Sequence, residues 1–107
     1  MHRADLRVTP KREDGDTVMV VAGELDMSTA DQLTDAVNEQ LRERPSRLVL
    51  DLGDLAFCDS LGLGTLVVLS RTARGQETFL VLRNPSPFLS RMLDVTGVRE
   101  GLNITES

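Results

Sequence analysis

The chain has 107 residues, of which 40% are hydrophobic and 27% charged, and its formal net charge is −5. This length is typical of one domain, residues 1–107, built around a single hydrophobic core. The acidic balance and an aromatic content of 3% argue against nucleic-acid binding, which relies on cations for phosphates and on rings for base stacking.

The cysteine count and the N-terminal residues favour a cytoplasmic protein. A lone cysteine, Cys58, cannot form an intramolecular disulfide, and a reducing compartment is then the default. The opening residues, MHRADLRVTPKREDGD, contain no apolar segment of a signal peptide, and no run approaches the roughly 18 apolar residues that span a bilayer. The sequon at 103–105 is therefore treated as a chance match.

The first predicted elements form a β-hairpin followed by a helix. Leu6 and Val8 indicate a first strand, and the acidic turn 13–16 leads into the largely β-branched run 17–22, which is typical of a buried strand. Ser28 and Asp31 then have the spacing of a helix capping box, with Asp in place of the usual Glu or Gln. The buried face of this helix is predicted from helical spacing to consist of Ala30, Leu33, Val37 and Leu41.

The middle of the chain predicts a strand, a helix and another strand. Pro45 ends the first helix, and the apolar run 47–52 reads as a strand central to a sheet. Ser60 is predicted to cap a second helix that Gly75 closes. Residues 78–82 form the next strand.

The C-terminal part predicts a short helix and an edge strand. Ser86 followed by Pro87 is a strong helix start, Gly97 ends the helix, and 102–104 form the last strand. The order β-β-α-β-α-β-α-β predicts an α/β fold with a mixed, mostly parallel sheet of four to five strands and helices mainly on one face. The apolar side of the short helix is predicted to comprise Phe88, Leu89, Met92, Leu93 and Val95.

The turn CDSLGLG, residues 58–64, contains the residues with the strongest functional signal. A serine at the N-cap of a helix satisfies free N–H groups, which is reason enough for Ser60 to be there. The same position also accommodates a phosphate, because the positive end of the helix favours an anion. The sequence leaves both interpretations of Ser60 open.

Gly62 and Gly64 weaken the start of a helix, each by roughly 0.5–1 kcal/mol relative to alanine. Glycines in these positions are explained either by tight packing of the helix against the sheet or by a helix end that a partner's backbone can approach closely. The spacing matches neither a Walker loop nor a dinucleotide-binding fingerprint, so nucleotide binding is not indicated.

Three acids are expected near this turn. Asp59 precedes Ser60, while Glu24 and Asp26 follow a neighbouring strand that also leads into a helix, so both turns should lie at the same end of the sheet. Each acid is alternatively a solvated turn residue, and Asp26 is alternatively another N-cap. With Ser60 the three would form a small acidic patch.

Other candidates near the turn indicate binding and not catalysis. Of Leu61 and Leu63, one should be core and the other exposed beside the acids. Cys58 reads as a small buried hydrophobic residue. Because His2 is the only histidine, no catalytic triad or metal-ligand spacing is present, and we expect neither an enzyme nor a metal or cofactor site.

Three segments, GELDMSTADQL, LVLDLGDLAFCDSLGLGTLVVLSR and LRNPSPFLSRMLDVTGV, resemble in this order the bacterial anti-sigma-factor antagonists of the STAS domain family. The resemblance implies a STAS fold and a partner that is an anti-sigma factor and a serine kinase, whose binding frees a sigma factor. It further implies that phosphorylation of Ser60 abolishes binding and that a serine phosphatase restores it. The partner-binding residues it implies are Glu24, Asp26, Asp59, Leu61, Gly62, Leu63 and Gly64.

Two departures from the family accompany this resemblance. Many relatives carry Ser, Thr or Ala where Leu61 stands, which is expected to alter partner choice. The sequence ends at Ser107, where relatives continue into a final amphipathic helix, and this difference is expected to favour a weak homodimer. A non-switching STAS scaffold or a transporter accessory subunit is the alternative function, and a small enzyme is the third.

Overall fold

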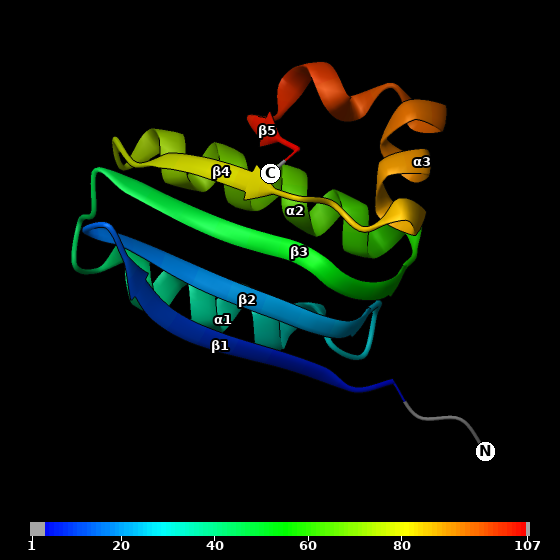
Figure 1. Ribbon diagram of the computed structural model, residues 1–107, viewed down its shortest axis with the longest axis horizontal. Coiled ribbons are helices and arrows are strands. Elements are labelled where there is room, and N and C mark those ends of the chain that lie inside the picture. The colour runs from blue at the N-terminus through cyan, green and yellow to red at the C-terminus, as the bar shows by residue number, and fades with distance from the viewer. Residues whose placement is uncertain (1–3, 107) are drawn as a thin grey trace.

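A five-stranded sheet forms one layer of the computed structural model, which describes residues 4–106 (Figure 1). β1 pairs antiparallel with β2, and the pairs β2–β3, β3–β4 and β4–β5 are parallel. This arrangement confirms the predicted hairpin and mixed sheet. The strands lie in chain order: β1 (Leu6–Glu13), β2 (Asp16–Leu25), β3 (Arg47–Cys58), β4 (Phe79–Arg83) and β5 (Ile104–Thr105).

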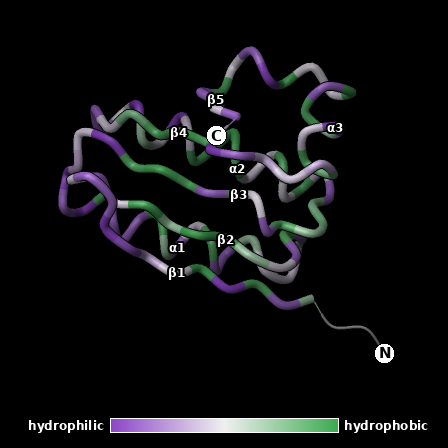
Figure 2. Tube along the Cα trace, viewed as in Figure 1, coloured by the Kyte–Doolittle hydropathy of each residue, from purple (hydrophilic) through white to green (hydrophobic). Residues whose placement is uncertain are grey.

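The helices pack on one face of this sheet, as predicted, around the larger of two apolar clusters. Figure 1 shows α1 and α2 behind the sheet and α3 at the end where β3 leads into α2. Figure 2 shows that apolar residues concentrate in the middle of β2 and in the first part of β3 and that hydrophilic residues occupy the turns. The helices are α1 (Ala30–Leu41), α2 (Ser60–Gly75), α3 (Pro87–Thr96) and the single 3-10 turn η1 (Val98–Gly101).

The opposite face of the sheet carries a second, smaller cluster of three buried valines, Val18, Val49 and Val81. On the neighbouring strands Arg83 bridges Glu13 and Asp51, with N–O distances of 3.0 Å to each. The hydrogen bond from Arg83 is the main reason that the pKa of Glu13 lies below its usual value. This ion cluster ties the hairpin to β4.

β2 and β3 are longer than the apolar runs that predicted them. Their pairing has two register shifts, between Val20 and Ala22 and between Gly23 and Glu24, and such bulges break the alternation that marks a strand in sequence. Gly23 has φ +107, and a Cβ there would lie 2.2 Å from the Asp5 carbonyl oxygen. Only glycine fits, and the strand continues past it.

The predicted capping box of the first helix is wrong. α1 begins at Ala30, and Thr29 in the N-cap position makes no side-chain capping bond. Ser28 instead donates its N–H and hydroxyl to the Asp26 carboxylate, at 2.8 and 2.7 Å. A short Asx-type turn therefore competes successfully with the capping box.

α2 ends at Gly75 and α3 has the boundaries that the sequence predicted, but Gly75 does not form the glycine cap expected of it. Gly75 is the last residue of α2 without a left-handed backbone, and Glu77 adopts the positive φ of 61°. Ser86 caps α3 by accepting a hydrogen bond from the Leu89 N–H, and Gly97 ends it in the left-handed conformation. Both ends of α3 were predicted correctly because local cap residues mark them.

Among residues 4–106, no helix is both long and apolar enough to cross a membrane. No group of three or more His, Cys, Asp or Glu within that range is placed to hold a metal ion. His2 lies outside the described residues.

Candidate functional site

The two turns predicted to share one end of the sheet do so. Leu25 and Cys58, the last residues of β2 and β3, are direct register partners in a parallel pair. The N–H of Asp59 donates to the Leu25 carbonyl across the two chain segments, at 3.2 Å. Asp26 and Asp59 therefore leave adjacent strand ends side by side.

Asp59, and not Ser60, caps α2, which corrects the sequence prediction. Its Oδ1 accepts the N–H of Gly62 at 2.7 Å, and its extended backbone is typical of an N-cap. Ser60 is the first helical residue, is exposed, and forms no side-chain hydrogen bond within the described part of the chain. Capping therefore does not explain why a hydroxyl stands at position 60.

The capping role of Asp59 gives a stability prediction. Asp59→Ala is expected to lower the free energy of unfolding by about 0.5–2 kcal/mol, because the Gly62 N–H loses its acceptor. Asp59→Asn should keep most of the stability, since asparagine is an equally good cap without the charge. Urea denaturation of the three proteins measures both effects, and equal losses for the two variants would contradict the capping role.

Asp26 is held in place by the turn that follows it. Besides its two bonds from Ser28, its backbone N–H donates to the Thr29 hydroxyl at 3.0 Å, and that hydroxyl donates to the Glu24 carbonyl at 2.8 Å. The Ser28 hydroxyl bond is the main reason that the pKa of Asp26 lies below its usual value. The carboxylate is therefore ionised at neutral pH, beside the start of α2.

Met27, at the tip of the same turn, is 79% exposed. The sequence analysis missed it, although an apolar residue between Asp26 and Ser28 in a polar turn is a recognisable signal. A flexible thioether beside two acids is a favourable apolar contact for a protein partner.

The two glycines in the first turns of α2, Gly62 and Gly64, have different reasons to be glycine. A Cβ on Gly62 would lie 2.6 Å from the Leu25 carbonyl oxygen and 3.0 Å from the Cys58 sulfur, so this glycine is required by packing. A Cβ on Gly64 would meet nothing within 4 Å. Gly64 is exposed, and it leaves a bare strip of helix surface.

The two leucines divide as predicted, one exposed and one core. Leu61 is 51% exposed and Leu63 is 5% exposed. Cys58 is buried as expected, and burial first and the Asp59 charge second raise the pKa of its thiol to about 12. Gly62 and Leu63 thus support the start of α2 from its buried side.

The surface formed by Glu24, Asp26, Asp59, Ser60, Leu61 and Gly64 is called the docking edge below.

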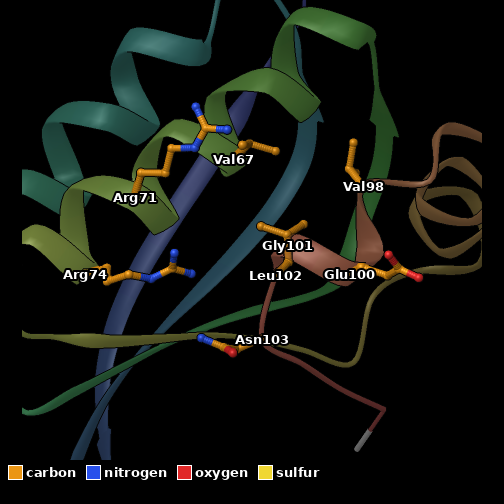
Figure 3. Close-up of a pocket in the computed structure, with 8 residues that line it drawn as sticks. All are labelled: Val67, Arg71, Arg74, Val98, Glu100, Gly101, Leu102 and Asn103. Atoms are coloured by element: carbon orange, nitrogen blue, oxygen red, sulfur yellow. The ribbon is translucent and has the colours of Figure 1, made fainter.

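A second surface feature lies at the other end of α2 (Figure 3). This groove is lined by Val67, Arg71 and Arg74 from α2 and by residues of η1 and the segment after it, among them Val98 and Glu100. Arg71 is eleven residues from Ser60, about 16 Å along the helix axis. The groove was not predicted, and it is separate from the docking edge.

Comparisons with known proteins agree with one another. A family model described as "Mlab, STAS domain" matches residues 8–105. The chain is 31% identical over 101 residues to an anti-sigma-B factor antagonist of Bacillus subtilis, covering 94% of this chain and 92% of the relative. It is similar to the crystal structure of an anti-sigma factor antagonist from Mycobacterium paratuberculosis, with a TM-score of 0.85 at 28% identity over 96% of this chain and 87% of that one.

A further solved structure shares the fold. The Bacillus cell fate determinant SpoIIAA in its phosphorylated form gives a TM-score of 0.67 at 19% identity, over 94% of this chain and 90% of that one. The predicted arrangement of strands and helices is therefore found in solved proteins.

Proposed function

Because the chain belongs to the STAS domain family, we infer that it is an anti-sigma-factor antagonist, and we propose that phosphorylation of Ser60 switches its binding off. The observation that carries the switch is the exposed Ser60, which has no capping role and directly follows the capping Asp59. The binding surface is the docking edge. The proposed activity is regulated binding and not catalysis.

The unphosphorylated docking edge combines charge with an accessible backbone. Asp26 and Asp59 supply negative charge, Leu61 an apolar side chain, and Gly64 a stretch of helix without a side chain. This surface fits a partner that places cationic side chains against the acids and brings its backbone close to the helix at Gly64. The neutral Ser60 hydroxyl lies within it.

A phosphate on Ser60 would change the charge of this surface without changing the fold. It adds about −1.5 to −2 charges next to the Asp59 carboxylate. That carboxylate already accepts the Gly62 N–H, so the phosphate does not take over the cap and stays exposed at the interface. Docking would then bury this dianion beside a carboxylate, against a partner surface that fits a neutral hydroxyl; removing such a charge from water costs several kcal/mol, and 1.4 kcal/mol is a tenfold change in affinity.

The proposal implies two partners and a location. The first partner is an anti-sigma factor with serine kinase activity, and the second is a serine phosphatase that acts on phosphorylated Ser60. Both are proposed to meet the chain in the cytoplasm. Partner-contacting roles for Glu24, Asp26, Asp59, Leu61 and Gly64 belong to the same proposal, whereas Gly62 and Leu63 support the surface from inside.

A sigma-release assay tests this function. Purified anti-sigma factors of the source organism, each in complex with its sigma factor, are mixed with the chain in the presence of ATP. The chain should release one sigma factor, and Ser60→Ala should release it for longer, because it cannot be switched off. Equal and lasting release by both proteins would contradict the switch and keep the antagonist role, and release from no complex would refute the antagonist role.

A further inference from the structure

All three phenylalanines of the chain are exposed, although the core is entirely aliphatic apart from Cys58 and Met19. Phe57 is 40% exposed, Phe79 51% and Phe88 45%. A folded protein gains stability by burying such rings, so their exposure needs another reason. Aromatic residues are the ones that most often dominate protein interfaces.

Two of these rings belong to one apolar surface that includes α3. Phe57 and Phe88 are in contact, with ring centroids 5.4 Å apart and planes inclined by 43°. Phe88, Met92 and Val95 recur at helical spacing and line a shallow groove together with Arg91, and Val95 is 79% exposed. The surface formed by Phe57, Phe88, Met92 and Val95 is called the α3 surface.

The fold does not require Phe88 and Val95 of the α3 surface to be apolar. α3 contributes Leu89 and Leu93, both fully buried, to the core. The sequence analysis assigned all five apolar residues of this helix to one side. The structure instead separates the two buried leucines from the exposed Phe88 and Val95, whereas Met92 is half-buried and packs against the core.

The α3 surface adjoins the docking edge. Phe57 is the register partner of Glu24 and lies three residues before Ser60. Phe88 follows the carboxyl end of β4, which runs parallel to β3, and α3 packs against β3 at the end where α2 begins (Figure 1). The N–H of Ser86 donates to the Leu52 carbonyl at 3.1 Å and fixes this approach.

We propose that the α3 surface is a second contact for the anti-sigma factor that binds the docking edge. This inference rests on the proposed function and names a further part of the partner's footprint. A stable interface involves about 20–30 residues on each side, and the six residues of the docking edge are too few by themselves. The α3 surface extends that area, because Phe57 pairs with Glu24 of the docking edge and contacts Phe88 of α3.

The composition of the two surfaces indicates the chemistry of the partner. Opposite the acids of the docking edge the partner needs cations, and opposite the α3 surface it needs apolar side chains. A carboxylate on the partner would pair with the exposed Arg91. A second copy of this chain is a poorer match, since four side chains are few for a stable dimer interface.

The chain offers a matched control for this inference. Phe79, the first residue of β4, lies at the opposite end of the sheet from Phe88 and is at least as exposed. We expect Phe88→Ala and Val95→Asp each to weaken binding of purified serine-kinase anti-sigma factors from the source organism by roughly tenfold, and Phe79→Ala by less than about twofold. Isothermal titration calorimetry measures affinities, and thermal melting confirms that all variants fold.

Three other outcomes would each overturn the inference. If Ser60→Asp abolishes binding while Val95→Asp binds like the unchanged chain, the α3 contact is wrong and the proposed function stands. If no anti-sigma factor binds the unchanged chain, the function and the inference fail together. If Val95→Asp dissociates a dimer in sedimentation velocity but leaves partner affinity unchanged, the surface pairs copies of this chain and the inference is overturned.

Discussion

Ser60→Asp is expected to weaken binding to the anti-sigma factor by more than about tenfold while leaving thermal stability almost unchanged. The binding loss follows because the new carboxylate stands beside the Asp59 cap and near the ionised Asp26, where a third charge must be desolvated against the partner. Stability is preserved because Ser60 is exposed and an acid in the first turn interacts favourably with the helix N-terminus.

Ser60→Asn is the matched control, since it adds a polar side chain of the same size without charge. Its affinity should stay within a fewfold of the unchanged chain. Calorimetry and thermal melting of the variants together separate a switch from a structural role. A large drop in melting temperature for Ser60→Asp, or equal binding losses for both variants, would contradict electrostatic switching.

Gly62→Ala and Gly64→Ala are expected to change stability in opposite directions. At Gly62 the new methyl group would lie within 2.6 Å of a backbone oxygen and 2.9 Å of Leu25 Cγ, and overpacking of this kind costs roughly 1–3 kcal/mol. At Gly64 the space is open, so alanine should stabilise the helix by up to about 1 kcal/mol.

Binding gives Gly64 a second, independent test. If the partner's backbone approaches the bare strip of α2, Gly64→Ala should weaken binding although it makes the chain more stable. Denaturant titration and calorimetry of the same preparations measure the two effects. A stabilised Gly64→Ala that binds like the unchanged chain would remove Gly64 from the docking edge.

The order of elements could be predicted because its signals are local. Ser86 and Pro87 mark the start of α3 and Gly97 marks its end, and the structure uses all three as predicted. The strand lengths could not be predicted, because the bulges near Gly23 depend on pairing with a distant segment. The short 3-10 turn η1, between the end of α3 and the last strand, was not predicted either.

The two turns were correctly predicted to lie at one end of the sheet, but the structural role of each residue in them was not assignable from the sequence. Asp59 and Ser60 are both good caps and differ by one position, so the sequence alone does not decide which one caps α2. Gly62 and Gly64 look alike in the sequence, and only the approach of Leu25 distinguishes them. The α3 surface was missed because helical periodicity does not separate its exposed residues from Leu89 and Leu93.

The central claim is that Ser60 is the phosphorylation switch of this antagonist. The most direct measurement is intact mass with site mapping after incubating the chain with ATP and the purified anti-sigma kinases of its source organism. The account predicts one phosphate, on Ser60, which is absent from Ser60→Ala under the same conditions. A kinase that binds the chain but leaves it unmodified, or modifies it only elsewhere, would contradict the switch and leave α2 as a docking helix capped by Asp59.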